Sequence, residues 1–91
     1  MRIIWTPRAA ADLEHAASYI ADRNPDAAIK VASKIYNRIM TLEATPEIAR
    51  IGVVQGTREI VFHPWPYIAV YKIFGGAVRI VRIRHASQQY P

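Results

Sequence analysis

The apolar residues in the first half of the chain recur at the spacing of a helix. Residues 2–5 have the pattern of a short strand, and Thr6-Pro7 then places an N-cap threonine before a proline in the first turn, a typical helix start. The predicted helix ends near Arg23, and its acidic residues lie away from its apolar face. That face is formed by Ala9, Leu13, Ala16, Ala17 and Ile20.

A second helix is predicted directly after the first. Asn24-Pro25 repeats the start signal, Asp26 puts a negative charge near the positive end of the helix dipole, and the apolar spacing continues to about Glu43. Its inner face is formed by Ala28, Ala32, Ile35, Ile39 and Leu42. Because few residues separate the two helices, they are expected to form an antiparallel hairpin.

The second half of the chain has the pattern of strands separated by turns. After a predicted loop at 46–56, strands are expected at 57–63, 67–74 and 77–85. Prolines interrupt the first junction, and Gly75-Gly76 is a strong hairpin signal at the second. The predicted fold is a single α+β domain over residues 1–91, with an N-terminal strand and an antiparallel two-helix hairpin packed on one face of a small antiparallel sheet.

The glycine turn also predicts which side chains share a face of the sheet. A two-residue loop at 75–76 sets Tyr71 opposite Ile80 and, further along, Tyr67 opposite Arg84. The face expected to be open carries Tyr67, Ala69, Tyr71, Ile80, Arg82 and Arg84. The face expected under the helices carries Ile68, Val70, Val81 and Ile83. Tyrosines beside arginines predict an anion-binding surface with stacking platforms; the alternative is a solvated face whose tyrosines shield the arginine stems.

The composition narrows the class of protein. With 91 residues, 52% of them hydrophobic and 21% charged, the chain has the make-up of one folded domain rather than a disordered segment. No apolar run has the length of a membrane span or of a signal peptide, so a cytoplasmic protein without a membrane partner is expected. There is no cysteine, and three histidines at 15, 63 and 85 have no ligand-like spacing, so no metal site or other cofactor is predicted.

The positive charge is confined to the second half. Residues 1–47 carry six basic and six acidic side chains, whereas residues 48–91 carry six basic and one acidic. Five of those six cations are arginine, whose planar fork of donors suits carboxylate or phosphate. An anionic partner is therefore expected, either nucleic acid or an acidic peptide.

The ordered set of motifs resembles the RelE/ParE toxin superfamily over essentially the whole chain. In the first half the motifs are Trp5-Thr6-Pro7, Ala11-Asp12-Leu13, Tyr19-Ile20, Pro25 with Ala27-Ala28, Leu42 and Pro46. In the second half they are Gly56-Thr57-Arg58-Glu59-Ile60-Val61, Pro66-Tyr67-Ile68-Ala69-Val70-Tyr71, Val81-Arg82-Ile83-Arg84-His85 and Gln88-Gln89-Tyr90-Pro91. The resemblance implies the toxin of a bacterial type II toxin–antitoxin pair, held inactive in a hetero-oligomer with its antitoxin.

One branch of this superfamily consists of enzymes. RelE-like members cut messenger RNA on the ribosome with the RNA's own 2′-OH as nucleophile, which requires a base, cations and an acid. By resemblance, Arg58 matches a catalytic arginine, Arg82 or Arg84 would supply a second cation, and His85 and Tyr90 lie at acid–base positions. The RelE-like lysines that precede the first arginine have no counterpart here.

The residues favour the other branch. His85 is expected at the edge of the core, and Glu59 is expected to pair with a structural arginine. The Thr57–Val61 run and the Gln88–Pro91 run resemble ParE-like toxins, which poison DNA gyrase by binding and are neutralised by ParD-like antitoxins. Gyrase binding without an enzymatic role is therefore favoured, with RNA cleavage as the alternative and a non-toxic nucleic-acid-binding module as a third possibility. The residues expected to contact the partner or target are Arg58, Tyr67, Tyr71, Arg82 and Arg84.

Overall fold

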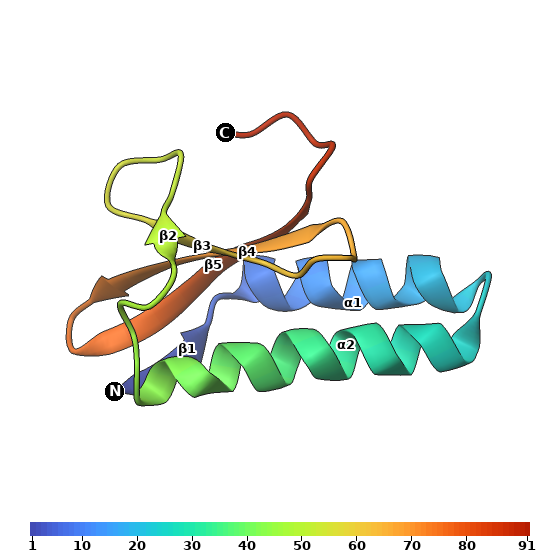
Figure 1. Cartoon of the computed structure of the whole chain (residues 1–91), viewed down its shortest axis with the longest axis horizontal. Coiled ribbons are helices and arrows are strands. Elements are labelled where there is room, and N and C mark those ends of the chain that lie inside the picture. The colour runs from blue at the N-terminus through green and yellow to red at the C-terminus, as the bar shows by residue number, and fades with distance from the viewer.

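The computed structural model describes all of residues 1–91 as two helices packed on a five-stranded sheet. In chain order the elements are β1 (Arg2–Trp5), α1 (Pro7–Ala21), α2 (Pro25–Met40), the 3₁₀ turn η1 (Thr41–Glu43), β2 (Arg50–Ile51), β3 (Arg58–Val61), β4 (Tyr67–Phe74) and β5 (Ala77–His85). Figure 1 shows α1 and α2 side by side on one side of the sheet. The segment around β2 and the C-terminal segment rise on the other side.

The two helices begin where the local sequence predicts. The hydroxyl oxygen of Thr6 accepts a hydrogen bond from the backbone N–H of Ala9 at 3.1 Å, and the side-chain oxygen of Asn24 accepts one from Ala27 at 3.1 Å. Each cap satisfies a backbone donor that has no partner within the helix. The helix hairpin is therefore confirmed, and the last predicted turn of the second helix is η1. Neither helix is of the length and apolar character that a membrane crossing requires.

The sheet is mixed, with the strand order β1-β5-β4-β3-β2. The predicted antiparallel pairing holds for β3, β4 and β5. β2 adds a further antiparallel pair with β3, and β1 runs parallel to β5. The pairing of β1 ends at Trp5 opposite Ile80, so the later residues of β5 have no strand on that side. The predicted loop at 46–56 contains β2, a short strand that the sequence pattern does not reveal.

A β-bulge in β5 makes the predicted register wrong beyond Ile80. Tyr71 lies opposite Ile80 as predicted, but Val70 lies opposite Arg82, which leaves Val81 as the extra residue. From there the pairs are shifted by one residue, so Tyr67 lies opposite His85 rather than Arg84. The inserted residue separates the two arginines from the tyrosines with which they were predicted to share a face.

The predicted assignment of the two faces is also wrong for β4 and for Ile80, although Ile83 lies under the helices as predicted. Tyr67, Ala69 and Tyr71 belong to the core under the helices, and all three are at least nine-tenths buried. Their core neighbours on β5 are Val78, Ile80 and Ile83. Ile68 and Val70 are buried as well, because residues 50–57 and 86–91 cover part of the second face. A strand covered on both faces is apolar throughout, so its pattern does not indicate which face meets the helices.

Candidate functional site

The face of the sheet away from the helices carries a compact group of charged side chains. Glu59 lies at its centre and is only 2% exposed. Its carboxylate accepts a hydrogen bond from Arg50 Nη2 at 2.9 Å and one from the backbone N–H of Val53 at 3.1 Å, and Arg84 Nη2 lies 3.7 Å away. The predicted pairing of Glu59 with structural arginines is therefore present.

The environment of Glu59 favours the carboxylate form. Burial, the largest single influence, by itself raises the pKa of Glu59, but the hydrogen bonds from Val53 and Arg50 and the positive charges of Arg84 and Arg50 act against it. Together they hold the pKa of Glu59 below its ordinary value. A group that remains ionised between two guanidinium groups is a poor proton acceptor, because protonation would leave both cations unpaired.

Arg84 lies beneath the C-terminal segment instead of on an open surface, contrary to the prediction. The residue is 7% exposed, its guanidinium carbon lies 4.7 Å from the centre of the Tyr90 ring, and its buried Nε has no hydrogen-bond partner. Arg84 and Arg50 share the single carboxylate of Glu59, so the group carries a net positive charge. The structure thus brings two of the candidate residues, Arg84 and Tyr90, into contact.

Arg58 binds the chain segment that precedes β2. Its Nη1 donates to the carbonyl oxygens of Glu47 at 3.1 Å and Ala49 at 2.9 Å. Opposite it in the sheet, the hydroxyl of Tyr71 donates to the carbonyl of Pro46 at 2.7 Å, and burial raises the pKa of Tyr71. Both candidate residues therefore hold the segment 46–49 against the sheet by satisfying its carbonyl oxygens.

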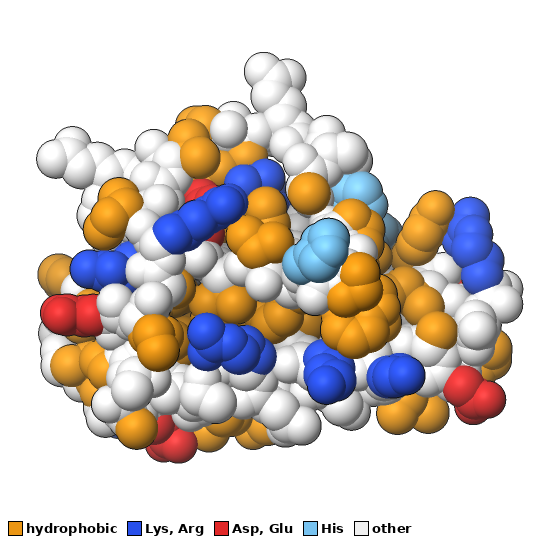
Figure 2. All heavy atoms as spheres, in the orientation of Figure 1, with side chains coloured by type: hydrophobic (Ala, Val, Ile, Leu, Met, Phe, Trp, Pro, Cys, Tyr) orange, Lys and Arg blue, Asp and Glu red, His pale blue; other side chains and the backbone are white.

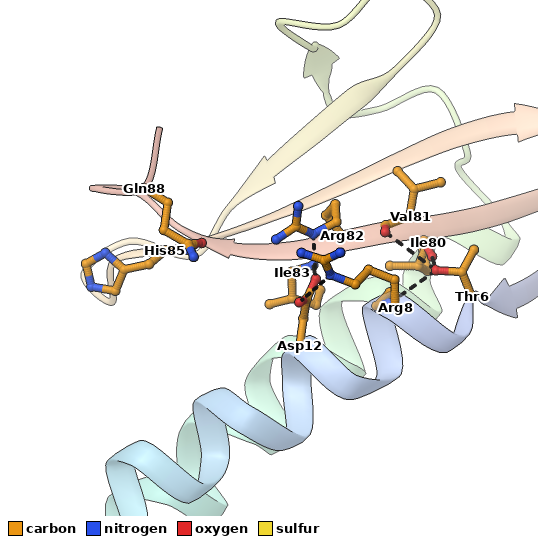
Figure 3. Close-up of polar contacts among 10 residues, drawn as sticks. Thr6, Arg8, Asp12, Ile80, Val81, Arg82, Ile83, His85 and Gln88 are labelled. Carbon is orange, nitrogen blue, oxygen red and sulfur yellow. Dashed lines mark hydrogen bonds and ion pairs between the residues drawn. The ribbon is translucent and has the colours of Figure 1, made fainter. Parts of the chain in front are cut away.

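Arg82 reaches round the free edge of β5 to the first helix (Figure 3). Its Nε donates to Asp12 Oδ2 at 2.8 Å, and the same oxygen accepts the backbone N–H of Ile83 at 3.0 Å. Arg8 adds a longer contact to Asp12 Oδ1, at 3.4 Å. The carboxylate of Asp12 thus takes the place of the neighbouring strand that β5 lacks beyond Ile80, and it neutralises Arg82.

Asp12 is the residue that sequence reasoning missed. In the helix pattern it is one of several acidic positions away from the apolar face, although it belongs to the Ala11-Asp12-Leu13 motif on which the resemblance rests. The signal that would identify it is topological: β1 is four residues long and β5 is nine, so part of the edge of β5 needs another acceptor.

His85 lies at the edge of the core, as the pattern predicts. Its ring meets Tyr67 edge-on with a centroid distance of 5.5 Å, and its Nδ1 lies 3.1 Å from the backbone nitrogen of Ser87. The five predicted contact residues therefore do not form one surface. Arg58, Tyr67 and Tyr71 lie on the helix side, whereas Arg84 lies on the opposite face and Arg82 at the sheet edge. No three acidic or histidine side chains are placed to hold a metal ion.

Comparison with known proteins gives consistent matches along the chain. The family model described as the ParE toxin of type II toxin–antitoxin system, parDE, matches residues 3–90. The candidate toxin Y4kP of Sinorhizobium fredii is 39% identical over 90 residues, covering 99% of this chain and 93% of that protein. Toxin RelE2 of Caulobacter vibrioides is 38% identical over 87 residues, covering 96% of this chain and 97% of that protein. A solved structure of the chromosomal ParDE toxin–antitoxin system from P. aeruginosa superposes with a TM-score of 0.86 at 28% identity, covering 96% of this chain and 97% of that one.

Proposed function

Because the chain belongs to the ParE toxin family of type II toxin–antitoxin systems, we propose that it inhibits growth by binding and poisoning DNA gyrase, and that a ParD-like antitoxin neutralises it in a hetero-oligomer. The choice of gyrase as the target rests on one observation: the candidate catalytic arginines are already bound to other groups of the chain. Arg58 is bound to backbone carbonyls, Arg82 to Asp12, and Arg84 to Glu59 and Tyr90.

RNA cleavage would require these groups to converge on a phosphate. The reaction needs a base beside a ribose hydroxyl, cations around the phosphorus and an acid at the leaving oxygen. Glu59 is enclosed by arginines, and the Nδ1 of His85 accepts the N–H of Ser87. A toxin that acts by binding needs none of these proton transfers.

The distribution of charge supports an anionic binding partner. The excess of basic over acidic side chains lies entirely in residues 48–91, and Figure 2 shows Lys and Arg side chains spread over one face of the molecule with few carboxylates between them. An acidic antitoxin segment would be attracted to this half, and its association would slow as salt screens the charges beyond about 8–10 Å.

RNA cleavage is the second candidate, on two specific observations. A relative of 38% identity carries the name Toxin RelE2, and Arg84 lies against Tyr90, which pairs a cation with a hydroxyl at one site.

Expression of the chain without an antitoxin separates the two candidates. Gyrase poisoning predicts broken DNA and an induced damage response with messenger RNA intact, and RNA cleavage predicts the reverse. His85→Gln and Tyr90→Phe sharpen the test, because both remove proton-transfer groups. We expect both variants to remain toxic and the purified chain to inhibit supercoiling by gyrase. Loss of toxicity in folded variants, together with cleaved messenger RNA, would establish the second candidate instead.

A further inference from the structure

A recess lies at the β5 edge of the sheet, between α1 and the end of β5. Its volume is about 290 Å³, and its walls come from α1, from the ends of β4 and β5 and from residues 87–88. Figure 3 shows His85 and Gln88 together at the end of β5, beyond the contact between Asp12 and Arg82. The recess is separate from the charged group around Glu59, which lies on the opposite face of the sheet.

Tyr67 presents an unused hydrogen-bond donor to this recess. The residue is 7% exposed, yet its hydroxyl has no hydrogen-bond partner within the chain. Burial and the neighbouring Tyr19 raise the pKa of Tyr67, so the hydroxyl keeps its proton at neutral pH. The hydroxyl is not among the buried atoms that lack a partner, so solvent reaches it, and an acceptor that enters the recess can take the place of water at this donor.

His85 presents a second donor, because its tautomer is fixed by the backbone. The N–H of Ser87 points at Nδ1 at 3.1 Å, so Nδ1 accepts and the proton of the neutral ring lies on Nε2. Gln88 is oriented in the same way: its Oε1 accepts the backbone N–H of His85 at 2.7 Å, which leaves its amide N–H groups without a partner in the chain.

The acceptor in the recess, by contrast, is already used. Both carboxylate oxygens of Asp12 are engaged, one by Arg82 and the backbone of Ile83, the other by Arg8. Two arginines around one carboxylate leave a net positive charge at this end of the recess. The recess therefore has donors without partners in the chain, its carboxylate acceptor is already bonded, and the nearby charges sum to a positive value. These features favour an anionic ligand with oxygen acceptors.

We propose that this recess binds a carboxylate attached to a short apolar body, with Tyr67, His85 and Gln88 donating to its oxygens. The size of the recess is at the low end for ligand sites, about 300 Å³, so it admits a group the size of one side chain or one small acid. Ala16, Ile83 and the ring of Tyr19 form the apolar wall. The site goes beyond the proposed function, because its binding of a carboxylate requires neither gyrase nor an antitoxin.

The test uses benzoate as the probe for a free acid and a short peptide with one central glutamate as the probe for an acidic side chain. Benzylamine has a similar body with the opposite charge. Titration of the purified full chain is followed by NMR shifts of the His85 ring and the Gln88 side-chain amide. We expect saturable shifts with benzoate or the peptide and none with benzylamine. Whichever of benzoate and the peptide binds more tightly identifies the source of the carboxylate, a free acid or an acidic side chain.

Two tyrosine variants provide the decisive comparison. Tyr67→Phe removes only a hydroxyl that has no partner in the chain, so we expect an unchanged melting temperature and binding weakened about tenfold, as for a lost hydrogen bond to a charged group. Tyr36→Phe, on the exposed side of α2, makes the same chemical change away from the recess and should bind as the parent does. Equal affinity of the Tyr67 variant and the parent, preference for benzylamine, or absence of saturation with both carboxylates would each overturn the proposal.

Discussion

Replacement of Asp12 tests whether one carboxylate joins the first helix to the last strand. Asp12→Ala removes the charge-assisted hydrogen bond from Arg82 and the acceptor of the Ile83 N–H, and the side chains of Asp12 and Arg82 are 14% and 24% exposed. A hydrogen bond to a charged group contributes about 1.5–3 kcal/mol, and water at the strand edge replaces part of it. We therefore expect a loss of about 2–3 kcal/mol in the free energy of unfolding.

Urea unfolding followed by circular dichroism measures this loss. As a check, the melting temperature of a domain of this size should fall by about 4–8 °C for each kcal/mol lost. Asp12→Asn keeps one acceptor and should lose about half as much. In a double-mutant cycle with Arg82→Ala, the coupling free energy between the two residues should be about 1–2 kcal/mol. Glu14→Gln, an exposed acid on the same helix, is the matched control and should stay within about 0.5 kcal/mol of the parent. Strict additivity, or an Asp12→Ala protein as stable as the control, would refute the assigned role.

The remaining predictions concern the other polar contacts and the hairpin turn. The pKa of Glu59 is lower in the folded chain than its ordinary value of 4.5, so its stabilising contribution is complete above that pH and is lost as the pH falls through the folded pKa. Glu59→Gln should therefore lower the free energy of unfolding at pH 7 and flatten the pH dependence of that free energy between pH 5 and 3. Urea unfolding at each pH measures both effects. Tyr71→Phe leaves the carbonyl of Pro46 without its donor and should cost about 1 kcal/mol in urea unfolding, against almost nothing for Tyr36→Phe. Gly76 has a φ of +71°, so Gly76→Ala should cost about 1 kcal/mol through backbone strain alone, because open space surrounds the added methyl; a stability equal to that of the parent would contradict this.

The helices could be predicted from the sequence because their signals are local. Thr6-Pro7 and Asn24-Pro25 each place a cap and a proline within a few residues, and the capping hydrogen bonds occur at those positions. The Gly75-Gly76 turn likewise fixes the first pairs of β4 and β5. Each of these features depends on residues that are neighbours in the chain.

The faces of the sheet could not be predicted because their determinants are remote. A single extra residue, Val81, shifts every later pair, and the mixture of apolar residues and arginines in β5 does not by itself place the bulge. The nearly continuous apolar run of β4 does not indicate its faces either, since residues 50–57 and 86–91 bury part of its second face. The role of Asp12 depends on β1 lying beside β5, a contact between opposite ends of the sequence.

That adjacency of the first and last strands bears on when the protein becomes active during its synthesis. β1, Thr6 and Asp12 have their partners at residues 77–83, so they stay unpaired until those residues have left the ribosome. At about 5–20 residues per second, the helix hairpin exists for several seconds before the strand that completes its core is made. A nascent chain that stalls before Ala77 lacks β5 and the residues of both sites on it. The toxin therefore reaches its folded form only after β5 has been made, and a neutralising partner has that interval in which to be present.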